Sequence, residues 1–314
     1  MDFIGLRAHT RAVPPKLDIH FGENLDVLAR FKRARFDLIY IDPPFNTGKR
    51  QARLERKTRR AKDGDHKGFY GERYRTVTIG SKSFADQFDD YMAFLEPRIE
   101  EAHRLLKPTG SFLLHLDYRE VHYAKVLTDA IFGRKSFQNE IVWAYDYGAR
   151  SKKRWPAKHD NILWYAKDPA NFTFRYDHVD RIPYLAPKLV TKEKAIRGKT
   201  PTDTWWHTIV SPNGKEKTGY PTQKPLGIID RIINVHTEPG DKVLDFFAGS
   251  GTIGESAIRQ GRSAVLVDQN EEAMQVMASR LAFARPKFHG WTPPAKPGGR
   301  ALKKARKKAR KKAL

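Results

Sequence analysis

The stretch KVLDFFAGSGTIGESA, residues 242–257, decides the fold of this chain. It starts with a short apolar run, passes through Gly249 and Gly251 at G-x-G spacing, and continues into residues that favour a helix, among them Gly254. Glycine permits the sharp turn and the close backbone approach that a strand-to-helix loop requires. The pattern predicts a buried strand, a tight loop and a helix, and it favours a nucleotide-type ligand at the loop.

Other segments repeat this alternation of apolar runs and helical patterns. Further buried strands are expected at 36–41, 111–116, 140–145, 161–166 and 263–268. Helices are expected at 84–106, 118–132, 225–236, 252–260 and 270–283, with Pro97 kinking or splitting the first of them. Strands that alternate with helices predict an α/β domain with a mainly parallel, twisted sheet and helices on both faces.

The strand expected at 263–268 ends in an acid. Asp268 follows the glycine loop by about twenty residues, where a carboxylate at the end of the second strand accepts both ribose hydroxyls of an adenosine group. No Walker lysine follows the glycines, which disfavours triphosphate hydrolysis. An adenosine ligand without phosphates fits the pattern better.

A second constellation is DLIYIDPPFNTGK, residues 37–49. Its apolar run reads as a strand buried on both faces, and Pro43 and Pro44 end it. Proline removes a backbone donor and fixes φ, so the turn after Asp42 is stiff and its carbonyls can accept hydrogen bonds from another group. A carboxylate beside such carbonyls suits a group with two N–H donors, although an ordinary strand-ending turn has the same composition.

The composition narrows the class of protein. The chain has 314 residues, a formal net charge of +23 and no cysteine. The charge indicates a polyanionic partner such as nucleic acid, and the lack of cysteine excludes disulfides and thiolate metal sites. The histidines at 103, 115, 122, 159 and 207 make no metal-ligand spacing and are interpreted as structural or phosphate-facing, so no metal site is predicted. No apolar run has the length of a signal peptide or membrane helix, so we expect no membrane association and a cytoplasmic, nucleoid-associated protein.

Several regions lie outside the α/β pattern. Residues 49–83 begin with the basic stretch KRQARLERKTRRAKDGDHKGFYGERYR and are expected to form a basic loop beside the turn at Asp42. Residues 171–218 contain TDTWW and resemble an insertion or small lobe, in which Trp205 and Trp206 either contact bases or pack. Residues 1–16 form an N-terminal arm, and 286–314 form a basic tail expected to be disordered until it meets phosphates. The remaining ranges, 17–170 and 219–285, are the predicted catalytic domain.

Together, DPPF at 42–45 and DFFAGSGT at 245–252 resemble the motifs of the DNA amino-methyltransferases that use S-adenosylmethionine. The catalytic motif of that family is (D/N/S)PP(Y/F/W), its cofactor motif is FxGxG, and the order found here is that of its β group. DPPFNTGK is especially similar to type III modification subunits and their relatives. The segments at 19–28, 104–115, 158–167 and 220–226 also resemble family segments, so the match covers roughly residues 17–285. The resemblance implies a Rossmann-like S-adenosylmethionine-dependent methyltransferase fold.

The resemblance also assigns roles to residues. Asp42 and the carbonyl of Pro43 would accept the two N–H groups of the target amine, Pro44 completes the turn, and Phe45 would stack on a base flipped out of duplex DNA. Thr222 and Lys224 would hold the methionine carboxylate of the cofactor. The cofactor-binding set implied by the family comprises Glu23, Thr222, Lys224, Asp245, Phe246, Phe247, Ala248, Gly249, Ser250, Gly251, Thr252 and Asp268.

The implied activity is methylation of adenine N6, because DPP with an aromatic is more typical of adenine enzymes and SPP of cytosine-N4 enzymes. Cytosine N4 is an alternative target, as are an RNA or protein amine and a catalytically idle DNA-binding homologue. Double-stranded DNA is the expected partner. Family members often dimerise, which makes a homodimer a candidate assembly, and a role in restriction-modification with an unknown restriction partner stays open.

Overall fold

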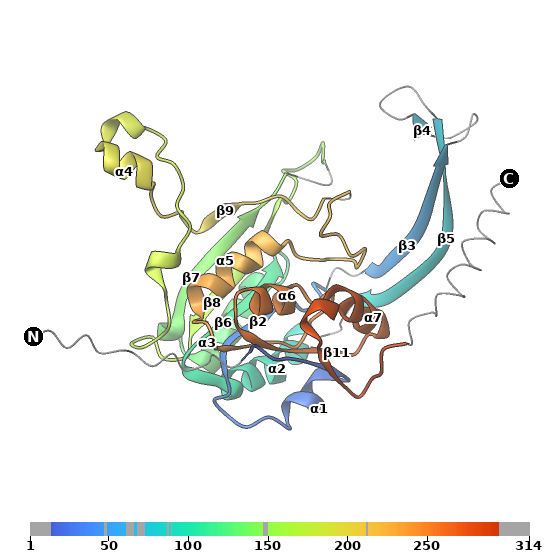
Figure 1. Cartoon of the computed structure of the whole chain (residues 1–314), viewed down its shortest axis with the longest axis horizontal. Helices are drawn as coiled ribbons and strands as arrows, with labels where there is room; N and C mark the ends of the chain where they lie inside the picture. Colours follow the sequence, from blue (N-terminus) through green and yellow to red (C-terminus); the bar gives the residue numbers. More distant parts are fainter. Residues whose placement is uncertain are drawn as a thin grey trace, which may run out of the picture.

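The computed structural model describes residues 14–46, 49–60, 66–67, 73–86, 88, 90–146, 150–211 and 213–294. Within them, nine strands form a mixed sheet at the centre of the molecule, in the order β12-β1-β11-β10-β2-β6-β8-β7-β9 (Figure 1). The strands are β1 (Leu17–Phe21), β2 (Phe36–Ile41), β6 (Leu106–Asp117), β7 (Phe137–Ala144), β8 (His159–Ala166), β9 (Thr204–Trp206), β10 (Lys242–Asp245), β11 (Ser263–Asp268) and β12 (Lys287–His289). From β12 to β6 all neighbours are parallel, whereas β8 runs antiparallel to both β6 and β7.

The side chains of β2 explain its central place in the sheet. All six of its residues are buried, and its apolar residues alternate between two hydrophobic clusters. Leu38 and Tyr40 pack into one cluster, while Ile39 and Ile41 pack into the other. A strand buried on both faces needs a continuous apolar run, and this is the pattern that the sequence shows.

Helices cover both faces of the sheet, as predicted (Figure 1). Helices α5 (Leu226–His236), α6 (Thr252–Arg259) and α7 (Glu271–Arg280) contribute Ile232, Ile253 and Met277 to the first cluster. The second cluster receives Leu28, Leu95 and Val121 from α1 (Asn24–Leu28), α2 (Tyr91–Leu105) and α3 (Val121–Phe132). No helix in the described residues is both long enough and apolar enough to span a bilayer.

Helix α2 differs from the helix that the sequence predicts at 84–106. It begins only after Asp90, whose carboxylate caps it by accepting a 2.9 Å hydrogen bond from the Ala93 N–H. It then continues through Pro97 as one helix, so of the two expected effects, a kink or a split, the split is wrong. Proline removes a single backbone donor, and the buried residues Leu95 and Ile99 on either side of it hold the helix against the sheet.

The expectation of a basic loop at 49–83 was also wrong for the residues that the structure describes. Strands β3 (Lys49–Arg60), β4 (His66–Lys67) and β5 (Arg73–Asp86) form a second, antiparallel sheet, and β3 and β5 project from the body as a long ribbon (Figure 1). Pairing runs from Lys49 opposite Asp86 to Arg60 opposite Tyr74. Two paired strands satisfy each other's backbone N–H and C=O groups, and this pairing does not require an apolar face. Hydrophobic alternation in the sequence therefore does not reveal the ribbon.

Residues 171–218 follow the outside of the catalytic body and do not form a compact lobe. The Arg175 guanidinium donates to the carbonyls of Asn234 and Thr237 at the end of α5. A finger that carries α4 (Lys192–Arg197) then projects outward (Figure 1), and β9 rejoins the main sheet beside β7. Trp205 is buried in the core, whereas Trp206 is exposed.

The ends of the chain correct one boundary. The predicted tail begins at 286, but residues 287–289 form β12, which pairs with β1 at the edge of the sheet. The tail boundary was therefore placed too early. Most of the predicted tail, residues 295–314, and residues 1–13 of the predicted arm lie outside the described residues.

Candidate active site

A cavity of about 430 Å³ lies at the carboxyl ends of β2 and β10, where both sequence motifs meet. Because these strands are parallel neighbours, the turn that follows each one opens at the same edge of the sheet. Asp42 and Gly249 both line the cavity. Of the predicted site residues, only Glu23 and Gly251 are not among its lining residues. The structure thus brings together two segments that are about 200 residues apart in the chain.

The Asp42 carboxylate has two different oxygens in this cavity. Oδ2 forms an ion pair with the Lys224 ammonium, whereas Oδ1 is buried and has no hydrogen-bond partner among the residues that the structure describes. A buried acceptor without a donor is costly, and it therefore marks a position where a ligand donor would bind. Next to it, the Tyr91 hydroxyl donates a 2.5 Å hydrogen bond to the carbonyl of Pro44 and fixes the turn.

Asn46, to which the sequence motifs gave no role, fastens the end of this turn. Its backbone has a φ of +51°, in the left-handed region that asparagine tolerates. Its side-chain oxygen accepts a 3.1 Å hydrogen bond from the Phe88 N–H, and its Nδ2 donates to Glu120 at 2.8 Å. The chain segments on either side of the ribbon are thereby tied together beside the cavity, which Phe88 also lines. The sequence feature that could have predicted this role is the asparagine of DPPFN, a polar residue directly after a stiff turn.

A buried polar chain lies behind Phe45. The Tyr40 hydroxyl is 2.6 Å from His115 Nδ1, and His115 Nε2 is 3.2 Å from the Asp160 carboxylate. Burial acts to raise the pKa of Asp160, but His115, Lys224 and the Tyr145 hydroxyl together outweigh it and lower that pKa. The His115 ring centroid lies 6.0 Å from that of Phe45. His115 is fully buried, so it is structural and does not face phosphates.

The glycine loop is closed by carboxylates. Asp245 is buried and accepts a 2.9 Å hydrogen bond from the Phe247 N–H. Burial raises the pKa of Asp245 well above its usual value, and the charges of Asp42 and Asp268 raise it further. Asp268 is the neighbouring acid across the loop, and burial raises its pKa to about 6. Three acids thus face one cavity, and a cationic ligand beside them would offset the burial and mutual repulsion that disfavour their ionised forms.

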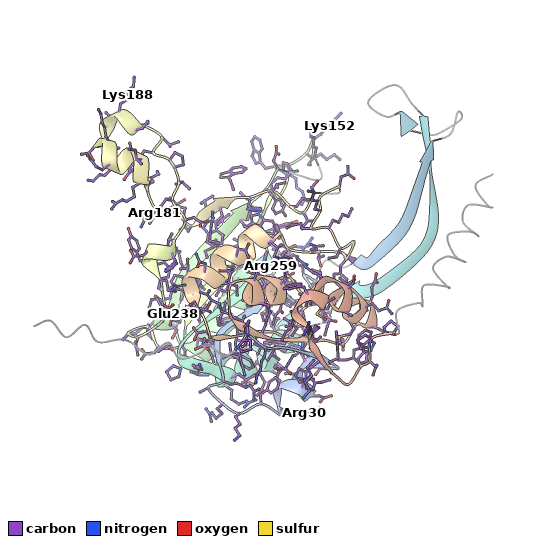
Figure 2. All side chains as sticks on the ribbon, viewed as in Figure 1. Arg30, Lys152, Arg181, Lys188, Glu238 and Arg259 are labelled. Atoms are coloured by element: carbon purple, nitrogen blue, oxygen red, sulfur yellow. The ribbon has the colours of Figure 1, made fainter. Side chains whose placement is uncertain are left out.

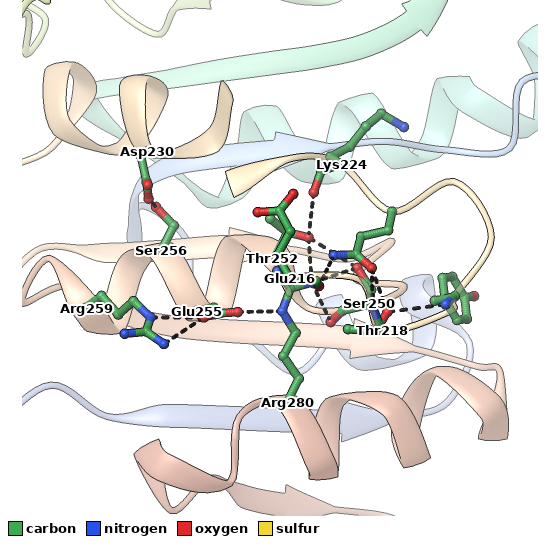
Figure 3. A network of polar contacts seen from close by, with 12 residues as sticks. Glu216, Thr218, Lys224, Asp230, Ser250, Thr252, Glu255, Ser256, Arg259 and Arg280 are labelled. Atoms are coloured by element: carbon green, nitrogen blue, oxygen red, sulfur yellow. Dashed lines mark hydrogen bonds and ion pairs between the residues drawn. The ribbon is translucent and has the colours of Figure 1, made fainter. Parts of the chain in front are cut away.

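Figure 3 shows how a buried ion pair supports this loop from behind. Arg280 Nε of α7 donates to the Glu255 carboxylate of α6 at 2.6 Å. Its Nη1 donates to the hydroxyls of Ser250 at 3.1 Å and Thr252 at 2.9 Å. The Thr252 hydroxyl in turn donates to the backbone carbonyl of Lys224 at 3.2 Å. The loop and the lysine segment are therefore held by one network.

Gly251 and Glu23, the two predicted residues outside the lining, have structural contacts. A Cβ on Gly251, whose φ is +74°, would lie 2.9 Å from Met277 Cγ, so this glycine lets the loop pack on α7. The Glu23 carboxylate caps α1 and bonds to Arg98. The next residue, Asn24, lines the cavity instead, and in the described part of the chain its buried Oδ1 has no hydrogen-bond partner. Asn24 is the N of the sequence GEN at 22–24, and it was missed because only the acid of that segment was assigned to the cofactor.

Comparisons with known proteins agree with this geometry. The sequence model of a family described as DNA methylase, of the N6/N4 type, matches residues 36–279. The chain is 28% identical over 257 residues to the type II methyltransferase M.HpaI of Haemophilus parainfluenzae, a match that covers 82% of this chain and 71% of the relative. It is 29% identical over 282 residues to the DNA adenine methyltransferase YhdJ of Escherichia coli (strain K12), covering 86% and 83% respectively.

Solved structures show the same fold. The M1.HpyAVI–SAM complex matches with a TM-score of 0.55 and 22% identity, over 84% of this chain and 98% of that one. The cytosine-N4-specific PvuII DNA methyltransferase matches with a TM-score of 0.56 and 17% identity, over 86% and 88%. The sheet and the helices on both of its faces are therefore those of a Rossmann-like methyltransferase fold.

Proposed function

Because the chain belongs to the DNA methylase family of N6/N4 amino-methyltransferases, we propose that it transfers a methyl group from S-adenosylmethionine to the N6 amine of an adenine flipped out of duplex DNA. The order of its motifs, the turn at Asp42 before the loop at Gly249, is that of the β group. The observation that carries the proposal is the buried, unpartnered Asp42 Oδ1 in the cavity that also contains the glycine loop.

The residues of the cavity fit the proposed cofactor. The Asp268 carboxylate accepts the ribose hydroxyls, and Asn24 Oδ1 offers a further buried acceptor. The carboxylates of Asp42 and Asp268 provide a negative environment for a ligand that carries a positive sulfonium. When bound, the cofactor supplies an electrophilic methyl group.

The catalytic turn acts on the amine. An exocyclic amine is a weak nucleophile because its lone pair is delocalised into the ring. Asp42 Oδ1 and the Pro43 carbonyl accept its two N–H bonds, which favours a tetrahedral nitrogen with its lone pair directed at the methyl group. The gain comes from orientation and from electrostatic stabilisation of a nitrogen that becomes cationic. The nitrogen gains the methyl group and afterwards releases one proton, so Asp42 need not remove a proton first.

Phe45 provides the platform for the flipped base. It lines the cavity next to Asp42, and stacking of a base on an aromatic ring contributes roughly 1–3 kcal/mol. The pairing of DPP with an aromatic favours adenine as the target. Cytosine N4 is the second candidate, because the PvuII enzyme that shares this fold is described as cytosine-N4-specific.

We assign DNA contacts to two projecting segments. Seven of the twelve residues of β3 are Lys or Arg, and a two-stranded ribbon has the dimensions of the major groove. Residues 171–218 are the candidate for target recognition, and their projecting finger carries Arg181 and Lys188 at its surface (Figure 2). Phosphate contacts of this kind position a protein on DNA, and base contacts then specify the site.

The test is transfer of a tritiated methyl group to unmodified duplex DNA, followed by analysis of the labelled nucleosides. We expect label in N6-methyldeoxyadenosine, and label in N4-methyldeoxycytidine would instead support the second candidate. Parallel reactions with RNA and with a glutamine-containing peptide test the other amine substrates. Asp42→Ala should abolish transfer and largely spare cofactor binding. Full turnover by that variant would remove Asp42 from the chemistry.

A further inference from the structure

We infer that Lys224 is a positioning residue for the methyl-transfer step, acting through Asp42, and not a ligand of the cofactor carboxylate. This inference rests on the proposed function. The family resemblance implies that Lys224 holds the methionine end of the cofactor. The structure instead directs its ammonium to the catalytic turn.

The ammonium of Lys224 has its contacts on the catalytic side of the cavity. It forms the ion pair with Asp42 Oδ2, and it lies 4.9 Å from the centroid of the Phe45 ring. It also approaches the Thr222 carbonyl at 3.4 Å. The side chains of the pair are 8% and 15% exposed, so solvent screens the interaction little.

The backbone of Lys224 is held so that its side chain bridges the two motifs. Its carbonyl accepts the hydrogen bond from Thr252 of the glycine loop, and its side chain extends away from that contact (Figure 3). Pro225, the next residue, caps the start of α5. Lys224 therefore links the cofactor loop, through its carbonyl, to Asp42, through its ammonium. A shift of the loop would therefore move the Asp42 carboxylate, which accepts a hydrogen bond from the target amine.

The ion pair decides which carboxylate oxygen is available. Because Lys224 occupies Oδ2, the target amine can donate only to Oδ1, and this defines the direction of its lone pair. The same cation offsets the repulsion between Asp42 and Asp245, which lie close enough for Asp42 to raise the pKa of Asp245. Burial raises the pKa values of Tyr40 and Tyr220, and the charge of Asp42 raises both further.

The test separates a role in transfer from a role in cofactor binding. Lys224→Met should lower kcat at saturating cofactor by about 10²-fold, the typical effect of a misplaced catalytic group, with little change in cofactor Kd. Lys224→Arg, which keeps the charge, should recover part of the rate. Lys32→Met, an exposed lysine on the loop after α1 and outside the segments assigned to DNA, is the control and should behave as wild type.

A double-mutant cycle measured by thermal unfolding tests the Lys224–Asp42 pair even in variants whose activity is too low to measure. The Tm decreases of Lys224→Met and Asp42→Asn, added together, should exceed the decrease in the double variant, because each single change breaks the same pair. Additive decreases would overturn the inference. A raised cofactor Kd with unchanged kcat in Lys224→Met would also overturn it while leaving the proposed function intact. A wild-type chain that binds cofactor but transfers no methyl group would overturn the proposed function itself.

Discussion

The Asp268 carboxylate accepts a 2.7 Å hydrogen bond from the backbone N–H of Gly249, which joins the end of β11 to the tip of the glycine loop. The other carboxylate oxygen accepts the Asn270 N–H at 2.8 Å. Both backbone bonds favour the ionised acid, but burial outweighs them and raises its pKa to about 6. The acid at this strand end therefore titrates near neutral pH.

Cofactor binding should weaken as pH falls below about 6. Ribose hydroxyls donate to the ionised carboxylate of Asp268, so a proton competes with the ligand once pH reaches the pKa of about 6. Calorimetric titration with S-adenosylmethionine between pH 5 and 8 measures this. Asp268→Asn is the control, and its weaker binding should no longer change across that window. An affinity of the wild type that is flat from pH 5 to 8 would contradict the assignment.

The Asp268 carboxyl should affect the free energy of unfolding with the opposite pH dependence, stabilising the fold more at low pH. Its folded-state pKa of about 6 lies above the usual 3.8, so the folded chain binds this proton more tightly than the unfolded chain does. Its contribution to the free energy of unfolding is thus greatest below about pH 4 and is lost as pH rises towards 6. The Tm difference between wild type and Asp268→Asn, measured without cofactor, should follow that trend.

The two arginines that bind Glu255 should differ sharply when each is replaced. Arg280 is 5% exposed, and its removal leaves a buried acid without its main partner, at a cost of about 3–5 kcal/mol. Arg259 is 60% exposed, so its removal should cost about 0–1 kcal/mol. Urea unfolding of Arg280→Ala and Arg259→Ala measures both. The former should also weaken cofactor binding, because Ser250 and Thr252 lose their support; equal destabilisation would contradict this account.

Gly254 should prove to be a packing residue. A Cβ at this position would lie 2.7 Å from Leu266 Cδ1 on the strand beneath α6, so Gly254→Ala overpacks the core at a cost of about 1–3 kcal/mol. Thermal unfolding measures the destabilisation. Leu266→Val removes the obstructing atom, and the double variant should be destabilised by less than the sum of the two single variants. An unchanged Tm for Gly254→Ala would show that α6 can move away from the strand.

The β3–β5 ribbon should set the salt dependence of DNA binding. Replacing Arg53, Arg56 and Arg59 with Gln removes three charges, and the slope of log affinity against log salt should fall by roughly 0.9 for each phosphate that is no longer neutralised. Fluorescence anisotropy with a duplex measures the slope, and cofactor affinity should stay the same.

The matched control removes the same charge elsewhere. Arg30, Lys32 and Arg33 are exposed on the loop after α1, at the end of the molecule away from the ribbon (Figure 2 labels Arg30). Their triple replacement with Gln should leave the salt slope near that of the wild type. Equal slopes for both triple variants would remove the ribbon from the DNA-binding surface.

The core strands were predictable because burial imposes a pattern on sequence. The runs at 36–41 and 263–268 match β2 and β11 residue for residue, since each strand is apolar on both faces. Strands β1 and β12 were not in that prediction. They lie at or near the sheet edge, where a short strand can be stable with fewer apolar residues.

Proximity of the two motifs was predictable, but the partners of their side chains were not. Parallel strands end at one edge, so Asp42 and Gly249 had to meet if β2 and β10 were neighbours. Sequence alone does not fix a rotamer, and nothing in PTQKP indicates that the Lys224 ammonium turns to Asp42. Nor does the sequence show that Glu23 pairs with Arg98 and that Asn24, the next residue, lines the cavity.

The sheet order has a consequence for biosynthesis. Strands β10 and β11 insert between β1 and β2, although they follow both by roughly 200 residues in the chain. When only the first two-thirds of the chain has been synthesised, β1 and β2 are present but β10 and β11, which lie between them in the sheet, are not. Such distant pairings fold slowly, and we expect the half-made chain to depend on chaperones and to be unable to modify the genome before its translation is nearly finished.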